Sequence, residues 1–210
     1  MSQRQDTHHP VMDTAQQSVG GNRSIDNLAK DFRFLRDQAV KGVFLQGSGF
    51  SPDGDMIEMR AYLGARLMWN PDLDPDQLRR EFFEAYYGKA ALVMDEYRRE
   101  IRQAFLDHNA HFVLGTKEPR HYAAVITNEM LARWYSLLDR AGSLAEDDVK
   151  RRHVRKARLT LVYTEGTLEQ DPARKRELLE RFVREAGELN IQRTSFGTGL
   201  QRFARKNISP

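Results

Sequence analysis

The residues best placed to do chemistry follow one short apolar segment near the start of the chain. The stretch "KGVFLQGSGF" predicts a buried strand over Val43–Gln46 followed by a glycine-rich turn. At the carboxyl end of a strand in an α/β barrel, Gln46, Ser48 and Phe50 would face a ligand pocket. An amide and a hydroxyl suit sugar hydroxyls, and an aromatic ring can stack on a pyranose face. The alternative is a strand that ends in a mobile turn and binds nothing.

A phosphate-binding loop is the other chemistry that this segment suggests. Gly42 and Gly47 supply its glycines, but Ser48 and Gly49 stand where the lysine and the Ser or Thr should follow. No helix is predicted to open there, and such a loop needs both the lysine charge and a helix N-terminus. The sequence therefore argues against a phosphate loop.

Carboxylates are plentiful after the strand, and a glycosidase needs two of them facing each other about 5–10 Å apart. The acids at 72–76 are explained by helix capping, with Asp74 as the N-cap and Pro75 at the first helical position. Asp53 and Asp55 lie in the loop after the strand. They are the acids that we expect near a pocket.

Metal chemistry has little support. His108 and His111 stand three residues apart near a predicted helix end, with no carboxylate at ligand spacing. The chain also has no cysteine, which excludes a thiolate site and a cysteine nucleophile. We predict no metal and no cofactor.

The run "KRRHVRKAR", Lys150 to Arg158, has six basic residues in nine and is a candidate nucleic-acid contact. However, the acidic residues Glu146–Asp148 stand four residues before Lys150–Arg152, the favourable polarity for ion pairs on a helix. The other basic residues should lie opposite an apolar face formed by Val154, Ala157 and Leu161. We therefore expect no nucleic-acid partner.

Aromatic residues gather between positions 69 and 87. Phe82, Phe83, Tyr86 and Tyr87 could form a sugar-stacking platform with Trp69. Their helical spacing is more typical of a core, which is the interpretation that we prefer.

Helical periodicity dominates the chain around these residues. The polar residues 1–24 are predicted to be disordered, and a helix should begin at Ser24 with Leu28, Phe32 and Leu35 on one face. About six helices are expected to pack as an antiparallel bundle over residues 54–190. The first helix of this bundle is predicted at about 54–68, with Ile57, Ala61, Gly64, Ala65 and Met68 in line. A break is predicted at Gly88, followed by an apolar stripe of Ala90, Met94, Tyr97, Ile101 and Phe105. Further on, we expect a helix at about 120–142 ending at Gly142, a capping box at Ser143–Glu146, and a last helix capped by Asp171 and Pro172.

The totals set broad limits. The 210 residues carry 33 basic and 30 acidic side chains, so the net charge of +3 is weak evidence for a polyanionic partner. No apolar run is long enough to span a bilayer, and we expect no membrane association. The first 24 residues lack the apolar core of a signal peptide. Localisation and oligomeric state stay open.

Several stretches resemble a bacterial family, the C-terminal part of domain of unknown function 4838. They are "FLRDQAVKGVFLQGS", "MRAYLGARLMWNPDLDPDQLRREFFEAYYGKAALVMDEY" and, more weakly, "RRHVRKARLTLVYTEG". The resemblance covers roughly residues 28–170. Its most specific pieces are Tyr62–Leu63, Ala65–Leu67, Trp69–Asp72, Phe82–Phe83, Tyr86–Gly88 and Ala90–Ala91.

That family is similar to glycoside-hydrolase barrels of the α-glucuronidase and hexosaminidase kind, with a helical domain after the last barrel strand. The resemblance implies carbohydrate processing, and a poly- or oligosaccharide as partner. It places residues 25–53 at the end of a TIM-like barrel and residues 54–190 in the trailing helical domain. Residues 191–210 are predicted from their own sequence to be a flexible or weakly helical tail. The earlier barrel strands, and the acids expected to do chemistry, have no counterpart in this sequence.

The predicted fold is therefore mainly α: an antiparallel multi-helix bundle preceded by one helix and one short orphan strand from a truncated TIM-like barrel. The predicted function is the helical C-terminal region of a glycoside-hydrolase-like protein, catalytically incomplete alone. The alternative is a self-sufficient helical protein-interaction module. We further expect Val43–Gln46 to be unpaired, frayed or covered by a helix, because a lone strand lacks ladder partners.

Overall fold

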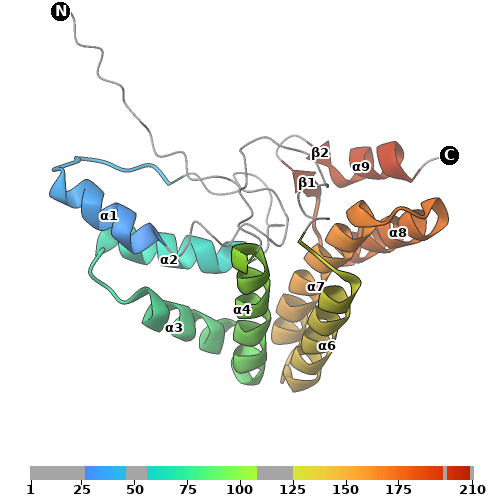
Figure 1. The fold of residues 1–210 in the computed structure, drawn as a ribbon, viewed down its shortest axis with the longest axis horizontal. Helices are drawn as coiled ribbons and strands as arrows, with labels where there is room; N and C mark the ends of the chain where they lie inside the picture. Colours follow the sequence, from blue (N-terminus) through green and yellow to red (C-terminus); the bar gives the residue numbers. More distant parts are fainter. Residues whose placement is uncertain (1–26, 46–55, 108–124, 196–197, 209–210) are drawn as a thin grey trace, which may run out of the picture.

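A computed structural model describes residues 27–45, 56–107, 125–195 and 198–208 (Figure 1). The described chain is mainly helical, as the periodicity predicts. Its elements are α1 (Leu28–Asp37), α2 (Ile57–Trp69), α3 (Pro75–Tyr87), the short 3₁₀ helix η2 (Gly88–Ala90), α4 (Ala91–Asp107), α6 (Asn128–Leu144), α7 (Asp148–Leu168), α8 (Pro172–Glu188), the strands β1 (Arg193–Ser195) and β2 (Thr198–Gly199), and α9 (Leu200–Asn207).

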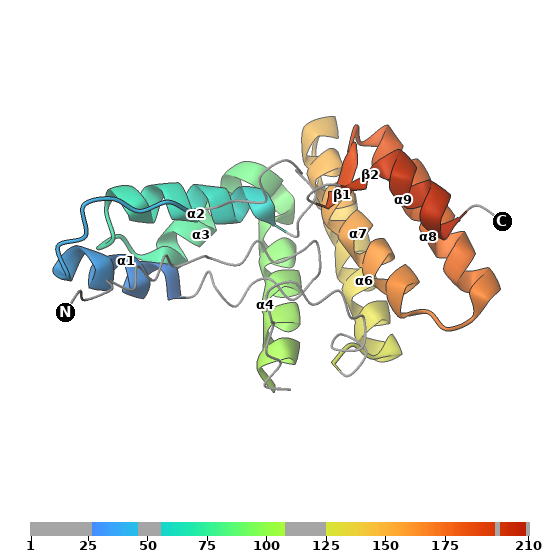
Figure 2. The same cartoon turned by 90° about the horizontal axis from the view of Figure 1, so that it is seen from above.

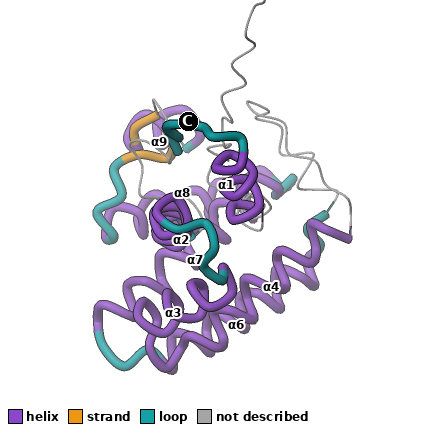
Figure 3. The backbone as a smooth tube through the Cα atoms, turned by 90° about the vertical axis from the view of Figure 1, so that its left-hand side faces the viewer, coloured by secondary structure: helices purple, strands orange, loops and turns teal. Residues whose placement is uncertain are grey.

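The helices follow one another across the molecule. Helices α1, α2 and α3 form one side, α4 stands in the middle, and α6, α7, α8 and α9 form the other side (Figure 1; Figure 2). Each of the larger helices packs on the next, α3 on α4, α4 on α6, α6 on α7 and α7 on α8. Figure 3 shows the backbone from the α1 side, with the helices in purple and the two short strands in orange. No helix of the described residues is long and apolar enough to cross a membrane.

The first apolar core lies between α1, α2, α3, α4, α6 and one face of α7. Its centre is the predicted stripe of η2 and α4, and all five of those side chains are buried. Residues spaced four and three apart fall on one side of a helix, so the stripe presents a continuous apolar face to α6. This part of the prediction is confirmed.

A second, smaller core lies between the C-terminal half of α7, α8 and α9. Helix α7 serves both cores from different faces, since Val154, Ala157 and Leu161 belong to the first and Leu159 and Val162 to the second. The apolar face predicted for α7 is therefore confirmed, and a second face was missed.

The starts of two helices follow their local sequence signals. The Asp74 carboxylate accepts a hydrogen bond from the Asp76 N–H at 2.9 Å, and Pro75 is the first residue of α3. The Asp171 carboxylate likewise accepts from the Arg174 N–H at 2.7 Å, and α8 begins at Pro172. Both caps satisfy backbone donors that have no partner inside the helix.

The predicted end of α6 is wrong. Helix α6 continues past Gly142 to Leu144, and the Ser143 hydroxyl donates to the Asp139 carbonyl at 3.0 Å. The next helix is capped by Asp147, whose carboxylate accepts from the Lys150 N–H at 2.8 Å. At its other end α6 begins only after Thr127, whose hydroxyl caps it by accepting from the Met130 N–H.

The buried face of α2 also differs from the prediction. Met59, Leu63 and Leu67 are buried, whereas Ala61, Ala65 and Met68 are exposed. Only Gly64 of the predicted line is buried, and it touches the chain segment that follows α1. The larger side chains, which remove more apolar surface from water, set the orientation of this helix.

That segment is not a strand over its described part, Val43–Leu45. Val43 and Leu45 pack against the first core, and a Cβ on Gly64 would lie 2.3 Å from a Leu45 methyl carbon, while Phe44 is 79% exposed. The segment makes no backbone hydrogen bond to another described residue. It is therefore held by side-chain packing on α2, and over Val43–Leu45 it has no ladder partner in the described part of the chain, as expected.

The C-terminal tail is more ordered than predicted. Strands β1 and β2 pair antiparallel, with Arg193 opposite Gly199 and Ser195 opposite Thr198, and α9 follows. Phe203 of α9 is only 9% exposed because its ring packs on the second core. One buried aromatic anchor thus holds a segment that the sequence predicted to be flexible or weakly helical.

Candidate functional site

Polar side chains from three helices meet in one recess, beside the junction of α3 and η2. Glu58 comes from α2, Tyr86 from α3, and His153, Lys156 and Thr160 from α7. The recess opens to solvent, and its own volume is about 10 Å³, room for about one water molecule. It is therefore far smaller than the pockets that usually hold a ligand, which span about 300–1,000 Å³.

The α7 residues reach the recess because they lie on the side of the helix next to the buried Ala157. His153 and Lys156 are three residues apart, so both project from the same surface of α7. Glu58 lies in the first turn of α2, where the helix dipole favours an acid. Tyr86 lies in the last turn of α3.

Glu58 and Lys156 form a partly buried ion pair that links α2 to α7. The same carboxylate lies close to the Tyr86 hydroxyl. Burial raises the pKa of Tyr86 far above its usual value, and the nearby charge and hydrogen bond of Glu58 raise that pKa further. Tyr86 therefore stays a protonated donor throughout the physiological range, and Glu58 acts as its acceptor.

His153 closes the recess from the side. Its ring stacks on Tyr86, with 3.6 Å between the ring centroids and 7° between the planes. Its Nδ1 lies 2.8 Å from the Tyr86 carbonyl oxygen. Because a carbonyl oxygen can only accept a hydrogen bond, Nδ1 must carry the hydrogen in this contact. The other ring nitrogen, Nε2, takes no part in it.

The polar side chains of the recess are therefore bound to one another, and few polar groups remain to contact a substrate. Glu58 is the only carboxylate among the described residues that line the recess, and it is bound to Lys156 and Tyr86. An acid–base pair for glycoside hydrolysis needs a second carboxylate across the site. Among the described residues there is also no group of three or more His, Cys, Asp or Glu that could hold a metal ion.

The residues predicted as the site all fall in segments that the structure does not describe. Gln46, Ser48 and Phe50 lie outside the described residues, as do the acids Asp53 and Asp55. His108 and His111 lie outside them too. The sequence interpretation missed Glu58 as a pocket residue, assigned Tyr86 to the core, and treated His153 and Lys156 only as members of the basic run.

That basic run is used for structure. Lys150 pairs with Asp147 at 2.7 Å and with Glu146 at 3.6 Å, and Arg151 pairs with Asp148 at 2.7 Å. The later basic residues, expected opposite the apolar face of Val154, Ala157 and Leu161, are also engaged. They reach other elements: Arg152 donates to the Leu189 carbonyl, Arg155 pairs with Glu188 on α8, and Arg158 pairs with Asp139 on α6.

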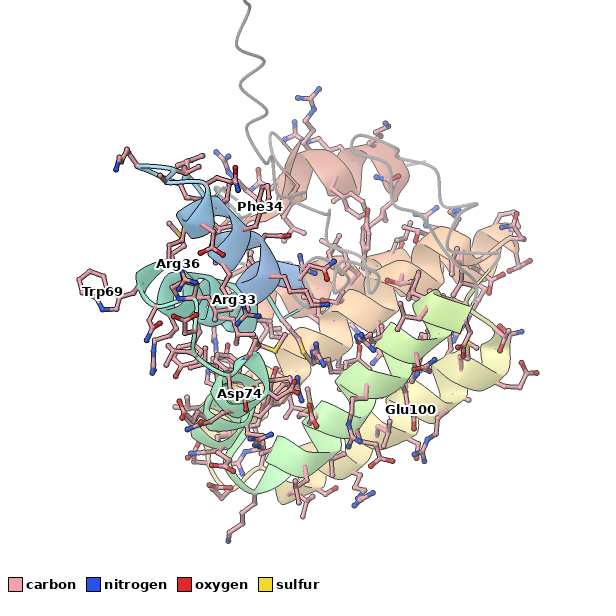
Figure 4. All side chains as sticks on the ribbon, turned by 60° about the vertical axis from the view of Figure 1, so that its left-hand side comes forward. Arg33, Phe34, Arg36, Trp69, Asp74 and Glu100 are labelled. Carbon is pink, nitrogen blue, oxygen red and sulfur yellow. The ribbon has the colours of Figure 1, made fainter. Side chains whose placement is uncertain are left out.

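The aromatic residues divide into a buried set and an exposed set. Phe82, Phe83 and Tyr87 are buried in the first core, in agreement with the core interpretation. Trp69 instead ends α2 and is 91% exposed. Figure 4 shows its ring pointing away from the helices.

Trp69 belongs to an exposed edge formed by α1, the segment after α1 and the C-terminal end of α2. Phe34 is 63% exposed on this edge (Figure 4), and Phe44 is exposed as well. The edge is fixed by polar contacts. The Arg33 guanidinium donates to the Pro71 carbonyl at 3.1 Å, and the Arg36 guanidinium pairs with Asp72 at 2.7 Å.

Comparisons with known proteins support one assignment. Neither the curated proteins nor the solved structures gave a match. The model of one family matches residues 19–99, the part of the chain that contains α1, α2, α3 and the first half of α4. Its description is "Domain of unknown function (DUF4838)", and residues 19–99 of this chain are similar to that family.

Proposed function

We propose that this chain is the helical C-terminal region of a carbohydrate-active, glycoside-hydrolase-like protein and that it is catalytically incomplete alone. In the complete protein the helices would support a TIM-like barrel, and the segment after α1 would lie at the end of that barrel. The family match and the mainly helical fold both support this proposal.

One observation carries the non-catalytic part of the proposal. Among the described residues that line the recess between α2, α3 and α7 there is a single carboxylate, and that carboxylate already neutralises a lysine and accepts from a tyrosine. A carboxylate held by both partners is not free to act as a nucleophile. The recess thus ties α7 to the family-matched helices α2 and α3.

Hydrolysis of nitrophenyl glycosides and glucuronides by the purified chain tests the proposal. We expect no release of nitrophenol above buffer, and no difference between the wild type and Glu58→Gln. Turnover in the wild type would contradict the proposal. If Glu58→Gln abolished that turnover, the recess would be an active site; if the variant kept it, the activity would lie elsewhere in the chain.

The exposed edge favours a second candidate, a self-sufficient helical protein-interaction module. Three large aromatic rings, Phe34, Phe44 and Trp69, are exposed there, and aromatic residues are enriched at protein interfaces. A thermal melt with and without oligosaccharides separates the candidates. A cooperative transition that no sugar shifts favours the module, whereas a rise of the midpoint with sugar favours the carbohydrate-active protein.

A further inference from the structure

The last 22 residues of the chain contain no acidic side chain. Glu188 is the last acidic residue, and four basic residues follow it: Arg193, Arg202, Arg205 and Lys206. The remaining 29 basic and all 30 acidic residues precede them, so the rest of the chain has a net charge of −1. The whole positive excess of the protein is therefore located in the C-terminal hairpin and α9.

Helix α9 separates this charge from its apolar side. Arg202, Arg205 and Lys206 are spaced three and four residues apart, which places them on one face of the helix, and all three are exposed. Phe203 lies on the buried side of the helix, with its ring centroid 5.6 Å from that of Phe182 and 5.8 Å from that of Tyr163. The Leu200 N–H donates to the Gln192 carbonyl at 2.8 Å and fixes the start of the helix.

These three cations have no ion-pair partner among the residues that the structure describes. The neighbouring helix α8 has glutamates, but each is engaged by another arginine. The pairs are Glu177 with Arg174, Glu180 with Arg176, Glu185 with Arg181, and Glu188 with Arg155. Helix α9 differs in this respect from the basic run of α7, whose cations are neutralised by nearby acids or bound to a carbonyl.

We propose that the outer face of α9 binds an acidic polysaccharide that carries uronate carboxylates. The choice of carbohydrate rests on the proposed function; the anionic character rests on Arg202, Arg205 and Lys206. Arginine binds carboxylates in a bidentate fork, and the exposed Gln201 beside the cations can bind sugar hydroxyls.

Two other polyanions fit the structure less well. Insertion into a lipid surface needs the apolar face of an amphipathic helix, and in α9 that face packs on α8. Single-stranded nucleic acid is bound by stacking bases on exposed aromatic rings, and the aromatic residue of α9, Phe203, is buried. The face offers charge and hydrogen bonds, which suit a uronate polymer.

The test measures binding of the full chain to polygalacturonate by calorimetry at several salt concentrations. The test variant is Arg202→Gln/Arg205→Gln/Lys206→Gln. The matched control is Arg80→Gln/Arg140→Gln/Arg176→Gln, which removes the same charge from exposed arginines that have acidic partners at 3.9, 3.6 and 2.9 Å. We expect the test variant to lose about tenfold to a hundredfold in affinity and the control to lose about threefold or less.

Wild-type affinity should also fall as salt rises, because each contact with the polymer releases counterions. Binding of a neutral polysaccharide and of a DNA duplex to the full chain is measured in the same way for comparison. No binding to polygalacturonate, an equal loss in the control variant, or equally tight binding of the duplex would each overturn the proposal. Hydrolysis of glycosides by the chain would contradict the proposed function but would leave this result intact, so the two failures are distinguishable.

Discussion

Gly88, at the junction of α3 and η2, should tolerate no side chain. Its φ of +56° and ψ of −126° lie in a region that residues with a Cβ rarely adopt. A Cβ there would also stand 2.4 Å from the Glu146 carboxylate and 2.5 Å from Lys150 Cε. The Lys89 N–H, which donates to Glu146 at 3.0 Å, would lose its acceptor as Glu146 moves away.

We therefore expect Gly88→Ala to lower the free energy of unfolding by about 1–3 kcal/mol from backbone strain alone. Gly142→Ala is the matched control, because Gly142 lies inside α6 and a Cβ there meets nothing within 4 Å. That variant should gain about 0.5–1 kcal/mol from the better helix propensity of alanine.

Urea denaturation followed by far-UV circular dichroism measures both changes in one experiment. The two variants should differ by about 1.5–4 kcal/mol in opposite directions from the wild type. If Gly88→Ala were as stable as the wild type with an unchanged dependence on urea, the described geometry of the α3–η2 junction would be wrong. If Gly142→Ala were destabilised instead, Gly142 would be a helix end, as its sequence context suggests.

Three further predictions follow from burial and charge. Leu161→Ala should lower the free energy of unfolding by about 2–5 kcal/mol because Leu161 is fully buried, whereas Leu92→Ala, at a position 83% exposed, should change it by about 0.5 kcal/mol or less in the same denaturation assay. Acrylamide should quench Trp69 strongly and Trp134 weakly, so Trp69→Phe should leave a blue-shifted emission that resists quenching. Hydrogen bonds and charge from Lys150 lower the pKa of Asp147 in the folded state. The stabilisation that the Asp147 carboxylate gives the folded protein is therefore present above the ordinary Asp pKa and is lost as the pH falls. Between about pH 5 and pH 2 the thermal midpoint of Asp147→Asn should accordingly fall less than that of the wild type.

The parts of the fold that the sequence predicted are those set by one helix at a time. The α4 stripe and the caps at Asp74 and Asp171 depend on residues within a few positions of each other. Such local signals fail where two of them compete. Ser143 and Asp147 both have the sequence of an N-cap, and tertiary structure selects Asp147 because the Glu146 carboxylate is bound to the distant Lys89 N–H.

The recess could not be predicted from the sequence, for a related reason. Glu58 and Lys156 meet although 98 positions separate them, and Tyr86 and His153 meet across 67. Only the packing of α7 against α2 and α3 brings them together, and no periodicity within one helix reports that packing. The orientation of α2 failed in the same way, because Leu45 occupies the space over Gly64 and the larger side chains of α2 turn toward the core.

The family match ends inside α4, but the core of that part of the chain does not end there. Ile101 and Phe105, later on the same helix, are buried with Trp134 from α6 and Leu161 from α7 in one continuous cluster. Without these partners the apolar stripe of α4 would face water, and short helices gain most of their stability from such packing. Helices α6 and α7 therefore belong to the same folding unit as the matched residues. A function assigned to the family-matched segment has to be tested on the chain that includes them.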